Sequence, residues 1–227
     1  MFTNANRKEN EWVLDNAWGD RMILPFRRTA EPLRVGLLGT GAVRNAKRKT
    51  EAMAGLLKFL DTPLYVLDTR RNGTGGQGSW APREFASEIP HLMKTERPYC
   101  FVHLPVVAPS VEMLAWNKSE KPGWRAFRDR YDRELTPDAV RVAAAFVEST
   151  ATRGGLAVLL CTEADVPGFR DAAPEIQEKE YCHRFTLARR IREFFSGLGV
   201  ELQSIPLRPD PRTSSPAGRA PSVVRHK

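Results

Sequence analysis

Five short runs of hydrophobic residues are spaced along the chain, at residues 33–38, 63–67, 99–104, 156–161 and 200–205. Each run contains β-branched or aromatic residues and is bounded by Gly, Pro or charged positions. Short apolar runs without polar alternation are typical of strands that are buried on both faces of a parallel sheet. The pattern therefore predicts five buried strands.

Helical patterns lie between these runs. Residues 52–60 and 124–131 place apolar side chains three and four positions apart, which is the spacing of one helix face. A third helix is expected over residues 136–152, with Thr136 as its cap and Pro137 at its first position, and a fourth over residues 183–198. Strands that alternate with helices predict an α/β fold, a single domain with a mostly parallel, Rossmann-like sheet flanked by helices.

The two ends of the chain differ from this pattern. We assign residues 33–207 to the α/β domain. Residues 1–32 show no regular period and are expected to form an irregular N-terminal extension that packs on the domain. Residues 208–227 are rich in Pro, Ser, Arg and Gly, and they bury too little apolar surface to offset the entropy of ordering. We expect them to form a disordered basic tail.

Composition excludes several classes of protein. The chain has 227 residues, of which 41% are hydrophobic and 27% charged, as in ordinary globular domains. Its apolar runs are far shorter than the roughly 18 residues of a membrane span, and its first residues lack the apolar segment of a signal peptide. Its three cysteines include no CxxC pair and make no disulfide framework. A cytoplasmic location without membrane contact is therefore expected.

The formal charge of +8 is concentrated in two segments. Residues 34–51 carry five basic residues against one acidic residue, and residues 208–227 carry the same excess, so each segment has a net charge of +4. The rest of the chain is neutral. The basic tail is expected to contact a nucleotide or nucleic acid. Contacts with a nucleotide or nucleic acid are also expected of four basic residues in the segment 34–51, namely Arg44, Lys47, Arg48 and Lys49.

A glycine turn follows the first predicted strand, at Gly39 and Gly41. A strand, a tight turn and a helix N-terminus together form an anion-binding arrangement, because free backbone N–H groups face the ligand. Two specific motifs are absent, however. A P-loop needs Lys and Ser or Thr after the last glycine, where this chain has Ala42, and the dinucleotide fingerprint needs a third glycine where it has Arg44.

Polar and reactive side chains follow the other predicted strands. The carboxyl ends of parallel strands meet at one edge of the sheet, which is where ligands bind in α/β proteins, so we expect these side chains to converge. The candidates for catalysis are Asp68, His103, Cys161, Glu163, Cys182 and His183. The candidates for substrate binding are Arg70, Arg184, Lys47 and Arg48. No metal ligand and no cofactor is assigned.

The strand ends that carry these candidates, together with two helical stretches, form a recognisable series along the chain. The stretches that carry it are Val66–Arg70, Val102–Pro105, Trp124–Tyr131, Leu160–Glu163 and Cys182–Ala188. In this order they resemble the uncharacterised bacterial and archaeal family called domain of unknown function 488, over roughly residues 33–207. The Cys-x-Glu segment followed by Cys-His-Arg is the most specific part. The chain departs from the family at Thr40, because the first strand of the family usually ends in Ile-Gly-His-Ser. The resemblance implies the fold and the place of the site, and no reaction.

Two kinds of enzyme chemistry fit these residues. In one, Cys161 is a nucleophile and His103 or His183 is its base. In the other, Asp68 and Glu163 act as an acid–base pair or as metal ligands. The arginines favour a phosphate-bearing substrate, because the guanidinium fork matches phosphate oxygens. The favoured function is therefore an enzyme that acts on a nucleotide or nucleic acid.

Four alternatives remain open on the sequence. The first is a zinc site made by Cys161, Cys182, His183 and His103. The direct adjacency of Cys182 and His183 argues against this site, because neighbouring residues are poorly placed to bind one ion. The second is a non-catalytic nucleic-acid-binding module. The third is an oxidoreductase that uses NAD(P). The fourth is a purely structural network in which Arg184 pairs with Glu163.

Overall fold

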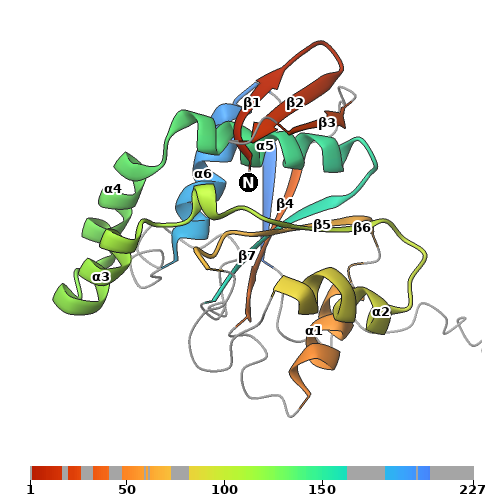
Figure 1. Cartoon of the computed structure of the whole chain (residues 1–227), viewed down its shortest axis with the longest axis horizontal. Coiled ribbons are helices and arrows are strands. Elements are labelled where there is room, and N and C mark those ends of the chain that lie inside the picture. Colours follow the sequence, from red (N-terminus) through yellow and green to blue (C-terminus); the bar gives the residue numbers. More distant parts are fainter. Residues whose placement is uncertain are drawn as a thin grey trace, which may run out of the picture.

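The centre of the molecule is a five-stranded parallel sheet (Figure 1). The computed structural model describes residues 2–16, 20–26, 33–40, 48–58, 60, 62–72, 82–162, 182–197 and 199–204. The strands are β4 (Leu33–Gly39), β5 (Leu64–Asp68), β6 (Tyr99–His103), β7 (Leu156–Cys161) and β8 (Val200–Ser204). Their order is β6-β5-β7-β4-β8, so that β7 lies between β5 and β4 at the centre of the sheet.

Helices cover both faces of this sheet. They are α1 (Lys49–Lys58), α2 (Ile89–Met93), α3 (Val111–Glu120), α4 (Trp124–Glu134), α5 (Pro137–Ala151) and α6 (His183–Phe194), with a π-helical turn η2 (Glu84–Glu88) and a 3-10 turn η3 (Pro105–Val107). Helices α1 and α2 lie on one side of the sheet, and α5 and α6 lie on the other (Figure 1). The predicted cap of α5 is confirmed, because the Thr136 hydroxyl accepts the Ala139 N–H at 3.2 Å.

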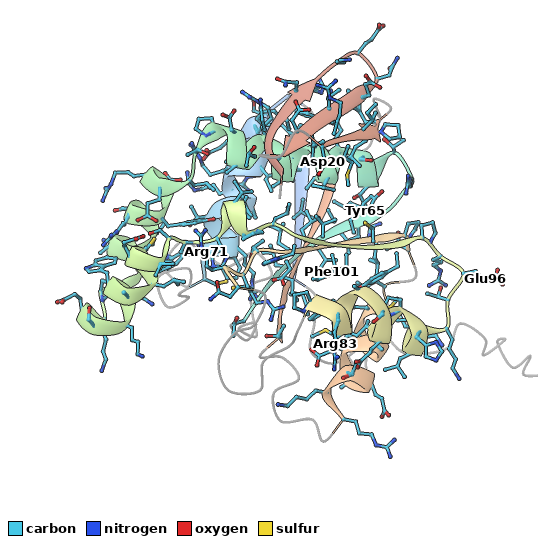
Figure 2. All side chains as sticks on the ribbon, in the orientation of Figure 1. Asp20, Tyr65, Arg71, Arg83, Glu96 and Phe101 are labelled. Atoms are coloured by element: carbon cyan, nitrogen blue, oxygen red, sulfur yellow. The ribbon has the colours of Figure 1, made fainter. Side chains whose placement is uncertain are left out.

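Successive side chains of each strand point to opposite faces of the sheet. In β7, Val158 and Leu160 belong to the core shared with α1 and α2, whereas Leu159 belongs to the core shared with α5 and α6. Figure 2 shows the same alternation in two neighbouring strands, where Tyr65 faces α5 and Phe101 faces α2. This alternation decides which of the predicted site residues meet.

Residues 1–32 contain a second sheet in place of the irregular extension expected from the sequence. Strands β1 (Phe2–Arg7), β2 (Glu11–Asn16) and β3 (Arg21–Pro25) pair antiparallel in chain order. This sheet packs on α5, where the buried carboxylate of Glu148 accepts hydrogen bonds from Arg7 Nη2 at 2.6 Å and from Trp12 Nε1 at 2.7 Å. The strands are short and rich in polar residues, so their alternation is weak in the sequence.

The predicted fold class is confirmed: the chain is a single α/β domain with a parallel sheet flanked by helices. The five predicted strands and the four predicted helices are all present, while η2, α2, η3 and α3 were not predicted. Within the described residues, the helices are too short or too polar to cross a membrane. The predicted tail at residues 208–227 lies outside the described residues.

Candidate functional site

The C-terminal edge of the sheet brings several of the predicted site residues to the same level. Asp68 is the last residue of β5, and in the register of the sheet it pairs with His103 on one side and with Leu160 on the other. Cys161 ends β7 and pairs with Gly39 at the end of β4. The strand ends are therefore aligned as the sequence predicts.

The alternation of side chains nevertheless divides these residues between the two faces of the sheet. Cys161 follows Leu159 by two positions and so points toward α5 and α6. Asp68 follows Val66 by two positions, and His103 follows Phe101 in the same way, so both point toward α1 and α2. The predicted single constellation is therefore two separate groups.

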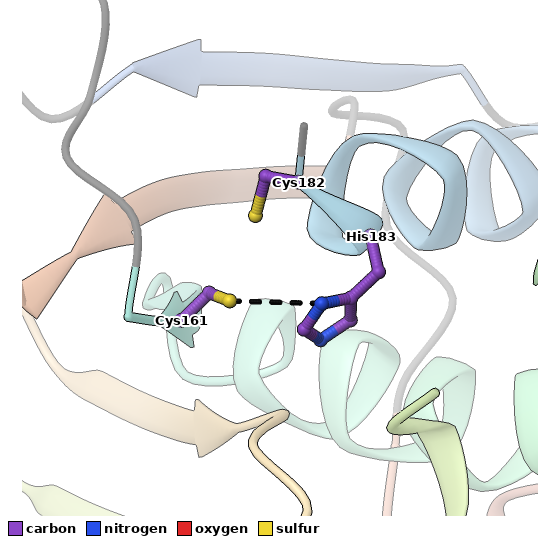
Figure 3. Close-up of side chains that lie close together, drawn as sticks. All are labelled: Cys161, Cys182 and His183. Atoms are coloured by element: carbon purple, nitrogen blue, oxygen red, sulfur yellow. Dashed lines mark hydrogen bonds between the residues drawn. The ribbon is translucent and has the colours of Figure 1, made fainter. Parts of the chain in front are cut away.

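On the α6 side, Cys161, Cys182 and His183 form a compact group that we name the sulfur–histidine cluster (Figure 3). One ligand atom from each residue lies within 4.8 Å of the other two, and all three side chains are buried. Cys161 Sγ and His183 Nδ1 are 3.6 Å apart. The cluster joins the end of the central strand to the first turn of α6.

Thr69 determines which nitrogen of His183 carries the proton. The Thr69 hydroxyl donates to the Leu160 carbonyl oxygen at 2.8 Å, so its oxygen is an acceptor toward His183 Nε2, which lies 2.9 Å away. The Thr69 carbonyl oxygen, also 2.9 Å from Nε2, is an acceptor as well. Nε2 therefore carries the proton, and in the neutral ring the lone pair of Nδ1 faces the sulfur of Cys161.

Tyr131 closes the other side of the histidine ring. The two rings meet edge to face, with their centroids 5.5 Å apart, and the Tyr131 hydroxyl donates to the Val107 carbonyl oxygen. Burial raises the pKa of Tyr131 well above its ordinary value, and the nearby Cys182 and Cys161 raise it further. Tyr131 is therefore uncharged, and its ring packs against the ring of His183 and holds it in place.

On the opposite face, Asp68 and Arg70 form a buried ion pair. Arg70 Nε donates to Asp68 Oδ1 at 2.7 Å, and Arg70 Nη2 donates to Asp68 Oδ2 at 2.8 Å. The Asp68 and Arg70 side chains are 0% and 4% exposed. His103 Nε2 lies 2.8 Å from the carbonyl oxygen of Arg70. Because Asp68 accepts hydrogen bonds from the guanidinium group of Arg70, we interpret this ion pair as a structural support for the end of β5, not as a substrate-binding group.

The remaining predicted residues are dispersed or lie outside the described residues. Arg184 is fully buried at the second position of α6. Arg48 is exposed just before α1 and pairs with Glu51 at 3.2 Å, and Lys49 is half-buried at the start of that helix. Three candidates fall outside the described residues, namely Arg44, Lys47 and Glu163.

Sequence reasoning missed the roles of Thr69 and Tyr131. Thr69 is not among the candidates from the sequence, although its position between Asp68 and Arg70 places it on the face opposite to both. Strict alternation from Tyr65 and Leu67 would have assigned it to the α5 and α6 face, on which Cys161 lies. Tyr131 lies on the helix face that the sequence predicts over residues 124–131 and is buried, but its contact with His183 depends on the packing of α4 against α6.

Comparison with known families bears on this cluster directly. The model of the family described as Domain of unknown function DUF488 matches residues 79–191, just under half of the chain. Comparisons with curated proteins and with solved structures found no match. The matched segment includes Cys161, Cys182 and His183, while Asp68 and Arg70 precede it. The chain therefore resembles the family Domain of unknown function DUF488, over the segment that contains the complete sulfur–histidine cluster.

Proposed function

We propose that the chain is an enzyme that acts on a phosphate-bearing ligand, a nucleotide or nucleic acid, and that the sulfur–histidine cluster is its reaction centre. One observation carries this proposal: the lone pair of His183 Nδ1 faces Cys161 Sγ at 3.6 Å, while Thr69 holds the proton on Nε2. A thiol in this position can pass its proton to Nδ1 and become a thiolate beside an imidazolium. The thiolate is the reactive form of cysteine, both as a nucleophile and as a metal ligand.

The place of the cluster in the sheet supports the same proposal. The segment after β4 leads to α1 on one face, and the segment after β7 leads to α6 on the other face, although β4 and β7 are neighbours in the sheet. In open α/β sheets, ligands commonly bind at such a switch point, beyond the carboxyl ends of the two strands. Cys161 ends one of these two strands.

The charge of the chain supports a phosphate-bearing ligand. The net charge is +8, and in the helix that follows β4, α1, Lys49 is the first residue and Arg48 directly precedes it. The exposed guanidinium of Arg48 is able to contact a phosphate in solvent, unlike the buried side chains of Arg70 and Arg184. We therefore assign phosphate contacts to the start of α1 and the chemistry to the cluster.

A turnover screen with matched cysteine variants tests this proposal. The full chain is incubated with nucleoside triphosphates and with short RNA and DNA strands, and products are followed by phosphorus NMR. We expect turnover by the wild type and a loss of about 10²–10⁴-fold in His183→Gln, as for removal of a general base. Cys161→Ala should lose turnover as well. Cys100→Ala is the matched control, because Cys100 lies at the opposite end of β6 from His103 and outside the cluster.

Two results would overturn the proposal. Turnover that is unchanged in both Cys161→Ala and His183→Gln would show that the cluster takes no part in the reaction. Binding of RNA or DNA without turnover, with an affinity that falls steeply as salt rises, would show a nucleic-acid-binding module instead.

A further inference from the structure

We propose that Cys161, Cys182 and His183 bind one zinc ion. Among the described residues, these are the only three Cys, His, Asp or Glu side chains whose ligand atoms gather within 4.8 Å of one another. Figure 3 shows the two sulfur atoms and the imidazole ring directed at the same small space. The inference deepens the proposed function and rests on it for catalysis: with zinc bound, Cys161 and His183 would serve as ligands in place of nucleophile and base, and a water on the ion would supply the nucleophile. Metal binding itself is measured independently.

The distance between two of the donors fits zinc. Zn–S bonds are about 2.3 Å long and Zn–N bonds about 2.0–2.1 Å, so a sulfur and a nitrogen on a tetrahedral ion lie about 3.6 Å apart. Cys161 Sγ and His183 Nδ1 are separated by 3.6 Å. One ion can therefore bridge these two atoms without moving either residue.

The hydrogen bonds of His183 are those of a metal ligand. A histidine that binds a metal through one nitrogen almost always donates its other N–H to a carbonyl or carboxylate oxygen, which fixes the tautomer and the direction of the lone pair. His183 Nε2 donates to the carbonyl and hydroxyl oxygens of Thr69, both at 2.9 Å. The Nδ1 lone pair is thereby directed into the cluster before a metal binds.

The backbone explains how two adjacent residues serve one ion. Cys182 is the cap of α6 and has an extended backbone, with φ −137° and ψ 122°, whereas His183 is the first residue of the helix. Neighbouring residues within a helix point about 100° apart around its axis. The change of backbone conformation between Cys182 and His183 brings both side chains to Cys161. Their adjacency in the sequence therefore does not prevent them from binding the same ion. His103 lies on the other face of the sheet and is not a ligand.

The chemistry of the donors selects the metal. Thiolate sulfur and imidazole nitrogen favour zinc, whereas magnesium and calcium require oxygen ligands. Two thiolates and one neutral imidazole on a divalent ion form a centre with no net charge, which suits the burial of all three side chains. Three protein ligands leave the fourth position of a tetrahedral ion for water or substrate, as in catalytic zinc sites.

Metal analysis of the full chain, purified without chelator, tests the inference. We expect about one zinc per chain in the wild type and in Cys100→Ala, and at least a tenfold lower zinc content in Cys161→Ala, Cys182→Ala and His183→Gln. Chelator-treated wild type reloaded with cobalt should show the intense thiolate-to-cobalt absorption in the near ultraviolet, and Cys161→Ser should lose it. Circular dichroism confirms that each variant is folded, and for a variant that is not, cobalt titration of the wild type decides alone.

The outcomes separate the inference from the proposed function. Wild-type protein that holds no zinc, and that gives no cobalt absorption when titrated with cobalt chloride, overturns the zinc site even if turnover depends on Cys161. Zinc at the cluster in a protein without turnover on any phosphate-bearing substrate supports the site and overturns the proposed function. Equal zinc content in wild type and Cys161→Ala overturns the assignment of ligands.

Discussion

Truncation of Asp68 should destabilise the fold far more than it alters chemistry. Asp68→Ala would leave the guanidinium of Arg70, whose side chain is only 4% exposed, without the carboxylate that binds it through two hydrogen bonds of 2.7 and 2.8 Å. Removing one partner of a buried ion pair costs about 3–5 kcal/mol. In a domain of this size, about 2–4 °C of melting temperature is lost per kcal/mol, so we expect a fall of about 6–20 °C.

A double-mutant cycle isolates the cause of this effect. Replacing both partners, as in Asp68→Leu with Arg70→Met, removes the two charges together and should stay within about 1–2 kcal/mol of the wild type. Urea unfolding followed by circular dichroism measures the four proteins of the cycle, namely the wild type, Asp68→Leu, Arg70→Met and the double variant, together with Asp68→Ala. Asp129→Ala, which removes an exposed carboxylate paired with Arg128, is the control and should cost less than about 1 kcal/mol. If Asp68→Ala unfolds like this control but loses turnover, Asp68 is catalytic and our structural interpretation is wrong.

Three further predictions concern Glu148, Tyr131 and Cys100. Glu148→Ala should lower the free energy of unfolding by about 3 kcal/mol, because it strands Arg7 and the indole N–H of Trp12, and urea unfolding that matches the wild type would contradict this. Burial raises the pKa of Tyr131, so above about pH 10 the Tyr131 hydroxyl keeps its proton in the folded chain and loses it in the unfolded chain. The free energy of unfolding should therefore fall as the pH rises above about 10, and it should fall less steeply in Tyr131→Phe. Burial also raises the pKa of the Cys100 thiol, so at neutral pH iodoacetamide should alkylate it more slowly in the folded than in the unfolded chain, as measured by mass spectrometry.

The sequence predicts the layers of this protein because each layer has a local signal. The run that becomes β7 is apolar from Leu156 to Cys161, and Thr136 with Pro137 marks the start of α5. The three-stranded N-terminal sheet was not predicted because it is held by long-range contacts with α5, among them the hydrogen bonds of Arg7 and Trp12 to Glu148, which lies more than 130 residues away in the chain. The two short helical segments before β6 and the helix α3 carry only weak apolar patterns, and so they were missed as well.

For the site, the sequence determined which residues end the strands, and therefore the edge of the sheet at which Asp68, His103 and Cys161 would lie. Only the tertiary structure decided which of them meet. Strand alternation sends Asp68 and Cys161 to opposite faces, and the packing of α6 brings Cys182 and His183 to Cys161 across 21 and 22 residues of chain. Spacing gives the face of a side chain only relative to its neighbours in the same strand. Which helices cover that face, and the angle at which a helix docks on it, depend on the packing of the whole core.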